Sequence, residues 1–414
     1  MFGEVSLLVI GLLLLASVLV RNPPLFICSI ILALMAVVSW LWDRYSLDKV
    51  EYRREFSQKR ALFGEEIDLV VEVVNRKPLP LAWLEAQDEI PSALKPVRGT
   101  VSASHKPERS LLLNLVSLRW YERVRRHHRI RCDARGYHKF GPAQLRSGDI
   151  FGFNTKSLVA PKEDYLLIYP KVVPISRLGL PSKDPFGDFK TRQWIFEDPL
   201  YTIGVREYTY GDSPRRIHWK ATARSQQLQV KLHEPRTTYR LAVFLNLNTA
   251  GPYWWWQGFS EELLELAVTT AASVATWAVE HGYQVGLYVN SHPHKSDQRV
   301  ELAPSRDPEQ LTRILEALAT IVPIAALPLE TLLRLQARTL PYGTTLAVVT
   351  AKLSDEIVTE LTSLKSAGHR VALLLIGNDV PQVELRGIAT YRIGDEEAWR
   401  ELRELAVDVG ERPR

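Results

Sequence analysis

The chain has 414 residues, of which 46% are hydrophobic and 24% are charged, and its formal net charge at pH 7 is +5. This composition excludes a largely disordered chain, and the length predicts two or three domains. The positive charge fits an anionic neighbour, either lipid headgroups or nucleic acid. The two cysteines, Cys28 and Cys132, cannot form a disulfide framework, which favours a reducing compartment.

Two apolar runs, residues 5–20 and 25–42, lie near the N-terminus and are separated by a short polar break. Each run approaches the length of about 20 residues that crosses a bilayer. We therefore predict a two-helix transmembrane hairpin over residues 1–48. A cleaved signal peptide is the alternative, but the N-terminal region holds Glu4 and no basic residue, and a second apolar run follows.

Basic residues predict the orientation of this hairpin. The connection between the two runs contains only Arg21, whereas several cations follow the second run: Arg44, Lys49, Arg53, Arg54, Lys59 and Arg60. Positive residues next to a membrane span stay on the cytoplasmic side. We expect a two-pass protein of the cell membrane, with both termini and the soluble domains in the cytoplasm.

Residues 49–175 consist of short alternating runs between turn signals. The runs that predict strands are residues 67–74, 111–116 and 165–169, and the turn signals are residues 75–80, 136 and 141–142. Short strands with regular turns are typical of an antiparallel β-sandwich.

Within this region, residues 119–133 are predicted to form one strand with a basic face. That face carries Arg119, Tyr121, Arg123, Arg125, His127, Arg129 and Arg131. It is either a solvated outer face or a surface that attracts anionic lipid or an acidic partner. Nucleic acid is not expected, because few exposed aromatic side chains lie between the cations to stack on bases.

The segment from 206 to 224 is dense in cations and aromatic residues. Its spaced positions are Arg206, Tyr208, Gly211, Asp212, Arg215, Ile217, Trp219 and Ala223. Together with the glycine-rich stretch at 135–153, this spacing resembles the signature of bacterial membrane proteins built on the domain of unknown function 58. The resemblance extends from the N-terminal hairpin to residue 248, and residues 176–238 are expected to form a signature joint segment.

A structural role is the first reading of this signature. Asp212 can cap the turn before Pro214 and pair with Arg215 or Arg216. Ile217 and Trp219 would then pack inward and join the sandwich to the next domain.

Two other readings remain open. In the second, the segment docks an acidic or phosphorylated partner through Arg206, Arg216, Lys220 and Arg224. In the third, Asp212 and His218 act as acid and base. Catalysis is less favoured, because it requires a convergent pocket that spacing alone does not indicate.

From residue 239 to 414, apolar strands without alternation are separated by helices. The expected strands are 241–247, 284–289, 345–350 and 371–377, and the expected helices lie at 263–279, after 308, at 329–338 and at 354–367. This pattern predicts a doubly wound α/β domain with a parallel sheet. It resembles the von Willebrand factor A type domain. The apolar helix at 263–279 contains polar residues and start and stop signals, so it is predicted to be buried in this domain.

Resemblance to von Willebrand A domains implies a cation loop, Asp-x-Ser-x-Ser, at the end of the first strand. This chain has Asn246, Asn248 and Ala250 at those positions. Neutral amides do not balance a divalent charge. We therefore expect a degenerate loop that binds no metal, and no cofactor.

Three tryptophans, Trp254, Trp255 and Trp256, follow that loop. Large aromatic side chains are usually buried, so packing beneath a loop is the first interpretation. If they are exposed, they form part of a partner-docking surface.

The chain contains no phosphate loop, nucleophile elbow, His-Glu-x-x-His or Cys-x-x-Cys motif, so no catalytic residue is assigned. The family resemblance implies a non-enzymatic adaptor or assembly factor that is anchored in the membrane and contacts its lipid. Its partner would be a MoxR-type AAA+ ATPase or a transglutaminase-like membrane protein. Two alternatives remain: a lipid- or envelope-polymer-binding module that uses the basic strand, and a hydrolytic enzyme that uses Asp212 and His218.

Overall fold

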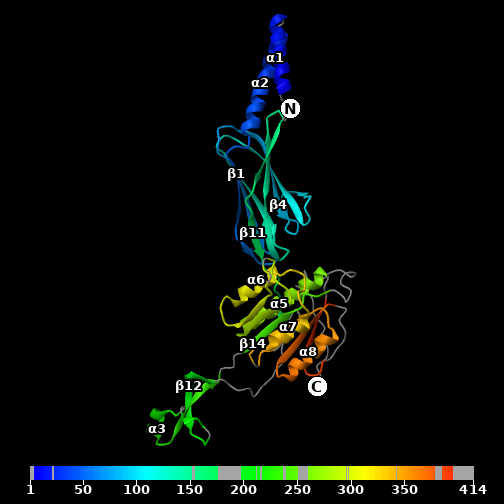
Figure 1. Cartoon of the computed structure of the whole chain (residues 1–414). Coiled ribbons are helices and arrows are strands. Elements are labelled where there is room, and N and C mark those ends of the chain that lie inside the picture. Colours follow the sequence, from blue (N-terminus) through cyan, green and yellow to red (C-terminus); the bar gives the residue numbers. More distant parts are fainter. Residues whose placement is uncertain are drawn as a thin grey trace. The chain divides into compact units, whose positions relative to one another are not determined.

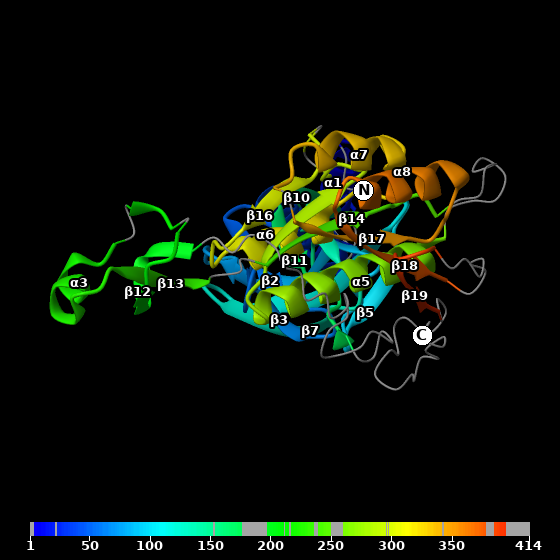
Figure 2. The same ribbon diagram turned by 90° about the horizontal axis from the view of Figure 1, so that it is seen from below.

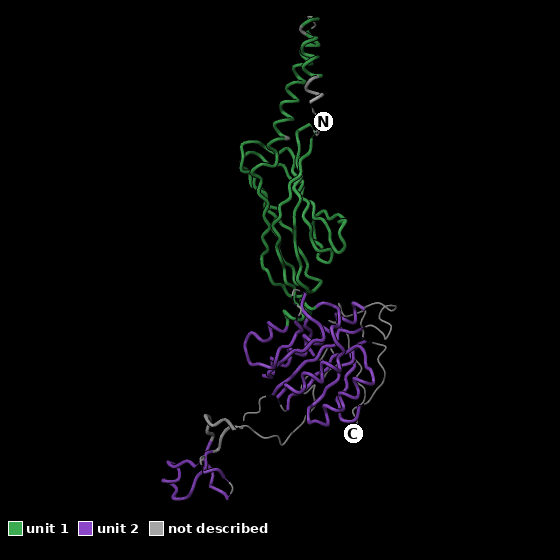
Figure 3. Tube along the Cα trace, in the orientation of Figure 1, with its two compact units in different colours: residues 1–171, 315–321 green, residues 172–314, 322–414 purple. Residues whose placement is uncertain are grey.

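The computed structural model is shown in Figure 1. It describes residues 4–394 except for 21–22, 152–153, 176–196, 211, 215–216, 236–238, 250–259, 295, 297, 342 and 378–384. The chain divides into two compact units (Figure 3), residues 1–171 with 315–321, and residues 172–314 with 322–414. Each unit has a hydrophobic core of its own. The expected division into four segments remains a prediction.

The first unit begins with two helices, α1 (Glu4–Leu19) and α2 (Pro23–Tyr45), which pack against each other. The stretch Pro23–Trp42 in α2 is 20 residues long, has a mean hydropathy of 2.5 and is only 17% buried. It is therefore long and apolar enough to cross a membrane. With 16 residues, α1 is shorter than a typical membrane-spanning helix. An apolar N-terminal helix is confirmed, and the two-pass topology remains a prediction.

A β-rich domain follows α2 in the same unit. Its strands are β1 (Val50–Phe56), β2 (Arg60–Ala61), β3 (Glu66–Asn75), β4 (Leu81–Pro91), β5 (Thr100–Ala103), β6 (Arg109–Leu118), β7 (Arg123–Arg131), β8 (Gly136–Phe140), β9 (Ala143–Gly148), β10 (Thr155–Ala160) and β11 (Asp164–Ile168). They form three sheets, β1-β3-β7, β10-β9-β4-β6-β5 and β2-β11-β8, in which only the β2–β11 pair is parallel. Side chains of all three sheets share one core, as expected for a sandwich.

In the second unit, β12 (Glu197–Glu207) pairs antiparallel with β13 (Gln229–Pro235), and the short helix α3 (Trp219–Ser225) lies between them in the chain. The sequence predicts a joint in this region, but neither the strand pair nor the helix. The reason is that β12 and β13 carry no sustained apolar alternation, which is the signal on which strand prediction depends.

A six-stranded mixed sheet forms the rest of the second unit. Its strands are β14 (Arg240–Leu245), β15 (Gln284–Val289), β16 (Glu301–Ser305), β17 (Thr345–Thr350), β18 (Arg370–Ile376) and β19 (Ala389–Ile393), in the order β16-β15-β14-β17-β18-β19. All neighbours are parallel except β15 and β16. The predicted α/β class is confirmed, whereas the sequence analysis missed the two edge strands, β16 and β19, which are short and only partly buried.

Helices cover both faces of this sheet. They are α5 (Glu261–Glu280), α7 (Leu329–Ala337) and α8 (Asp355–Ser366). A further helix, α6 (Gln310–Thr320), lies between β16 and α7 in the chain. In Figure 2, α7 and α8 lie on one side of β14, β17 and β18, and α5 lies on the other. The Ser260 side chain caps α5, where it accepts a hydrogen bond from the Leu263 N–H at 3.3 Å. Most of α5 is buried, which confirms the predicted core helix.

Candidate functional site

The signature unit, residues 204–230, contains the end of β12, a turn, α3 and the start of β13. Its turn is closed by the carboxylate of Asp212. The guanidinium of Arg206 donates to both carboxylate oxygens, at 2.8 Å from Nη1 to Oδ2 and 2.6 Å from Nη2 to Oδ1. The Thr209 N–H and hydroxyl also donate to Oδ2, both at 2.9 Å. A bidentate arginine pair of this kind fixes both position and orientation.

These contacts determine the protonation of Asp212. The Arg206 guanidinium, followed by the Thr209 N–H, holds the pKa of the carboxyl well below its usual range. An efficient general acid or base has a pKa near the working pH, so Asp212 is poorly suited to proton transfer. The sequence analysis paired Asp212 with Arg215 or Arg216, which lie outside the described residues, and did not identify Arg206 as its partner.

His218 begins the helix α3. Its ring Nδ1 accepts a hydrogen bond from the Ala221 N–H at 3.0 Å, and the backbone N–H of His218 donates to the Gln229 carbonyl at 2.8 Å. The first contact is a helix cap, which satisfies one of the free N–H groups at a helix start. The His218 ring thus binds a backbone N–H of its own unit, and the Asp212 carboxylate does the same with the Thr209 N–H.

Aromatic and cationic side chains of the signature unit face solvent. Trp219 is 68% exposed, Tyr210 is fully exposed, and Lys220 and Arg224 are exposed as well. The expectation that Trp219 packs inward is therefore wrong, because α3 contains no buried residue and lies on a two-stranded hairpin.

The other signature residues complete this picture. Ile217 is half-buried and forms an isolated bridge with the buried Val230, so its expected inward packing is only partly found. Tyr208 is half-buried, and its N–H donates to the Leu228 carbonyl at 2.8 Å. Gly211 lies outside the described residues, as do Trp254, Trp255, Trp256 and Ala250.

At the carboxyl edge of the mixed sheet, three polar side chains meet. Asn246 follows β14, Asn290 follows β15, and Thr350 ends β17. Asn246 donates from Nδ2 to the Thr350 hydroxyl at 3.0 Å and accepts at Oδ1 from Asn290 Nδ2 at 2.8 Å. All three residues are buried. The ends of neighbouring parallel strands in such a sheet are where ligands usually bind.

The hydrogen-bonding groups of this network are used within the protein. Asn246 Oδ1 also accepts from the N–H of Asn248 at 3.1 Å, and Asn290 Oδ1 accepts from the Leu247 N–H at 2.9 Å. The Thr350 hydroxyl donates to the Lys352 carbonyl at 2.7 Å. A divalent cation prefers carboxylate oxygens, so these residues do not fit one. Among the described residues, no group of three or more His, Cys, Asp or Glu side chains could hold a metal ion.

The sequence analysis named Asn246 but missed Asn290. A signal was available, because each asparagine directly follows an apolar strand of the same type. The two strands pair in parallel, with Leu245 opposite Val289, which brings the following residues to the same edge. Strand order, which a single sequence does not give, was needed to bring them together.

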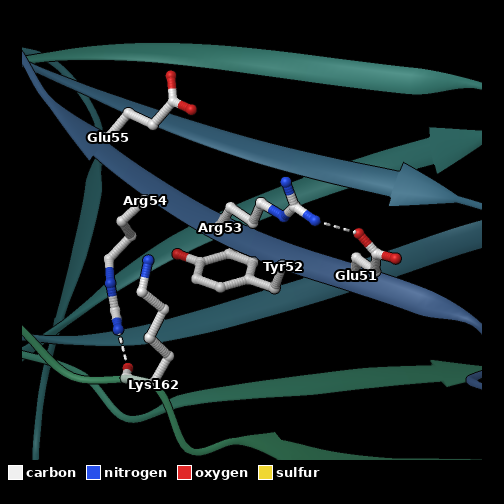
Figure 4. Close-up of a pocket in the computed structure, with 6 residues that line it drawn as sticks. All are labelled: Glu51, Tyr52, Arg53, Arg54, Glu55 and Lys162. Atoms are coloured by element: carbon white, nitrogen blue, oxygen red, sulfur yellow. Dashed lines mark hydrogen bonds and ion pairs between the residues drawn. The ribbon is translucent and has the colours of Figure 1, made fainter.

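A surface hollow of about 460 Å³ lies over β1. It is lined by Glu51, Tyr52, Arg53, Arg54, Glu55 and Lys162 (Figure 4). Arg54 is buried and donates to Asp88, to Asp164 at 3.1 Å and to the Lys162 carbonyl. The Tyr52 hydroxyl donates to Asp88 at 2.7 Å. Burial raises the pKa of Tyr52 well above the ordinary tyrosine value.

These hydrogen bonds hold β1 to the neighbouring strands. They also offset the cost of burying the Arg54–Asp88 ion pair, which is tolerated only when its members are well hydrogen-bonded. The hollow therefore contains no free reactive group among its buried side chains and serves the fold of the sandwich.

The predicted basic face is confirmed along β7 but is partly neutralised by carboxylates. Glu72 lies 2.7 Å from Arg125 and 3.7 Å from Arg123, and Arg131 lies 2.9 Å from Asp133. Arg129 lies near Glu66 and Asp68. The strand also begins later than predicted, because residues 119–122 form the turn that precedes β7.

Comparison with solved structures gives only weak similarity. The CARDB domain of the PF1109 protein from Pyrococcus furiosus matches with 10% identity and a TM-score of 0.21, over 29% of this chain and 90% of that chain. A cohesin module from a Clostridium perfringens family 33 glycoside hydrolase matches with 12% identity and a TM-score of 0.20, over 29% of this chain and 95% of that chain. Similarity at this level supports no conclusion about function.

Among curated proteins, the uncharacterized protein YeaD of Bacillus subtilis (strain 168) is 21% identical over 244 residues, which are 59% of this chain and 56% of that protein. The chain thus spans little more than half the length of this relative. A family model described as "Protein of unknown function DUF58" matches residues 204–402. The match begins in β12 and includes the signature unit and the mixed sheet, whereas the sequence analysis had placed the resemblance mainly before residue 248. The chain therefore contains a DUF58 family domain over residues 204–402.

Proposed function

We propose that this chain is a membrane-anchored, non-enzymatic adaptor whose signature unit docks an acidic protein partner. One observation carries the proposal. Asp212 and His218, the two groups that could have served as acid and base, bond to the backbone or side chains of their own unit. The aromatic and cationic side chains beside them remain exposed.

The chemistry of the exposed side chains suits a protein interface. Tryptophan, tyrosine and arginine are the residues that most often dominate binding energy, and here Trp219, Tyr210 and Arg224 are exposed on one small unit. Arg224 and Lys220 give this surface a positive charge, which complements an acidic partner. By family resemblance the partner is a MoxR-type AAA+ ATPase, with a transglutaminase-like membrane protein as the second candidate.

The mixed sheet belongs to a von Willebrand A-like domain in this proposal. The strand order, with β14 and β17 at its centre and one antiparallel strand near the edge, supports that relationship. The crevice between β14 and β17 is where such a sheet binds ligands, and here Asn246 and Thr350 bond to each other. The domain then acts as a scaffold that binds no metal.

The anchor in this proposal is the α1–α2 pair, which crosses the cell membrane twice and leaves both termini in the cytoplasm. The apolar and largely unburied stretch of α2 supports it. Arg44 and Lys49, which are exposed and follow that stretch, support the orientation.

Neither alternative has comparable support. A lipid- or polymer-binding role for β7 would need free cations, but Arg123, Arg125 and Arg131 lie beside carboxylates. A hydrolase would need Asp212 to transfer protons, but its lowered pKa and its bidentate bond to Arg206 disfavour this role.

Charge reversal tests the docking role. The full chain in detergent micelles, with Lys220→Glu and Arg224→Glu combined, is expected to bind the purified MoxR-type ATPase of the same organism roughly tenfold more weakly than the unaltered chain. Arg338→Glu is the control, because Arg338 is an exposed arginine outside the signature unit. Equal affinity of all three proteins would contradict the proposal.

A further inference from the structure

The end of the sandwich next to α2 carries exposed apolar side chains. In the loop between β9 and β10, Ile150 is 55% exposed and Phe151 is also exposed. Trp120 and Tyr121, in the turn between β6 and β7, are exposed as well. Apolar side chains gathered on the surface of a folded domain mark a contact with a protein or a membrane.

Hydrogen bonds attach the β9–β10 loop to α2. Asp149 accepts a hydrogen bond from the Ser39 hydroxyl, and Asn154 Nδ2 donates to the same hydroxyl at 3.2 Å. Ser39 and Asp149 are both buried. The loop is therefore fixed at the level of Ser39 on the helix.

The β6–β7 turn lies at the same end of the sandwich. Lys77 Nζ donates to the Asp48 carbonyl at 2.8 Å, directly after α2. The Lys77 carbonyl in turn accepts from the Tyr121 N–H at 3.3 Å. Exposed apolar side chains thus lie near the C-terminal end of α2 in two loops.

The level of Ser39 can be compared with the thickness of a bilayer. The apolar stretch of α2, Pro23–Trp42, has 20 residues. At 1.5 Å per residue this stretch covers about 30 Å, which is the thickness of the hydrocarbon core. Ser39 lies three residues before its end, or about 4.5 Å along the axis. A loop held at Ser39 therefore lies close to the boundary between hydrocarbon and headgroups, on its hydrocarbon side.

We infer that the segment directly after β9 inserts into the lipid bilayer beside α2, with Ile150 and Phe151 at the membrane interface. This inference rests on the proposed membrane anchor. Trp40 is exposed on α2 one residue from Ser39, and the exposed Tyr45 lies about 9 Å beyond Ser39 along the helix. Both are residue types enriched at that boundary. The exposed Arg44 and Lys49 favour a leaflet with anionic lipids. The loop and the helix then hold the sandwich at two points and restrain its rotation about α2.

Cysteine accessibility tests this inference, and the chain provides matched controls. Ile150→Cys and, separately, Phe151→Cys are made in a Cys28→Ser background. Val97→Cys is the reference, because Val97 is 56% exposed and Ile150 is 55% exposed. Val97 lies near the opposite end of the sandwich, where its N–H donates to the Arg129 carbonyl. Cys132 stays silent, because burial raises the pKa of its thiol to about 12.

The proteins are placed in vesicles of phosphatidylethanolamine and phosphatidylglycerol and treated with a membrane-impermeant maleimide. The cysteines at 150 and 151 are expected to react roughly tenfold more slowly than the cysteine at 97. The reason is that side chains at the membrane interface are removed from water, where the maleimide is dissolved. In the chain with its natural Cys28, that residue reports on the anchor, because it lies in α2 and is exposed on the protein surface.

Two outcomes would overturn the inference in different ways. If the cysteines at 150 and 151 react as fast as the one at 97 while Cys28 stays protected, the anchor holds and the loop lies in water. If Cys28 itself reacts as fast as the cysteine at 97, the membrane anchor fails and the loop insertion fails with it.

Discussion

Two polar regions of the DUF58 domain differ in how they use side chains of similar chemistry. At the carboxyl edge of the mixed sheet, Asn246, Asn290 and Thr350 are buried and bond to one another. In the signature unit, the side-chain bonds of Asp212 and His218 hold their own turn and helix, while Trp219 is exposed. These three polar side chains, at the edge where a sheet of this kind usually binds ligands, are therefore satisfied within the protein, whereas the signature unit presents exposed aromatic and cationic groups.

This difference bears on how function is inferred from fold. A sheet edge invites the search for a metal or substrate, but hydrogen bonding decides whether its polar groups can reach one. Groups already paired in a buried network contribute to stability, and exposed aromatic and cationic groups contribute to recognition. Substitutions in the two regions should therefore affect different measurements.

The largest expected effect follows from Asn290→Leu. This change removes one of the two donors to Asn246 Oδ1 and leaves the Leu247 N–H without its side-chain acceptor. The free energy of unfolding of the mixed-sheet region is expected to fall by about 3 kcal/mol, because buried polar groups lose their partners. Pulse proteolysis across a urea series measures the change. Asn248→Ala is the control, since the Asn248 side chain is exposed, and equal losses in the two variants would contradict the contrast.

Trp219→Ala is expected to act on binding and not on stability. Because Trp219 is exposed and α3 has no buried residue, the free energy of unfolding should change by less than about 0.5 kcal/mol. Affinity for the MoxR-type ATPase should fall by about 2 kcal/mol, the loss typical of an interface hot spot. Calorimetry of both processes separates them, and a destabilised variant with full affinity would reverse the expected roles.

Arg206→Lys tests how the turn of the signature unit is held. Lysine cannot make the two parallel hydrogen bonds that Arg206 makes to Asp212. The Thr209 N–H, which donates to the same carboxylate, should then exchange faster with deuterium. Arg224→Lys is the control, since it makes the same change at another exposed arginine and should leave the exchange rate of the Thr209 N–H unaltered. Faster exchange in the control as well would contradict a specific role of Arg206.

The smallest expected effect is the pH dependence of the same turn. The folded-state pKa of Asp212 is lowered by Arg206, so the stabilisation is complete above the ordinary aspartate value of about 4 and is lost only as pH falls through the lower folded value. Protection of the Thr209 N–H, corrected for intrinsic exchange, should stay constant from neutral pH to about pH 4. In Arg206→Lys the loss should begin at higher pH, and a loss near pH 6 in the unaltered chain would contradict the assignment.

Much of the fold could be predicted from the sequence where apolar periodicity is strong. The core helix α5 and the strands β14, β15 and β17 follow from continuous apolar runs with clear start and stop signals. The strands β12 and β13 could not be predicted in this way, because a two-stranded hairpin buries too little surface to leave a pattern.

The candidate site was predicted only in part, for a related reason. Residue types and spacing identified the signature segment and Asn246, but not the partners of either. Arg206 reaches Asp212 across a turn, and Asn290 reaches Asn246 through strand pairing. The exposure of Trp219 goes with a short helix that contains no buried residue, which no local pattern encodes.

Site-specific photo-crosslinking in cells that contain the MoxR-type ATPase tests the docking role of the signature unit most directly. A benzophenone side chain is introduced at Trp219, which is 68% exposed, and in a second protein at Trp120 of the sandwich, which is 67% exposed. The account predicts a covalent adduct with the ATPase from position 219 and none from position 120. No adduct from position 219, or equal adducts from both positions, would contradict it.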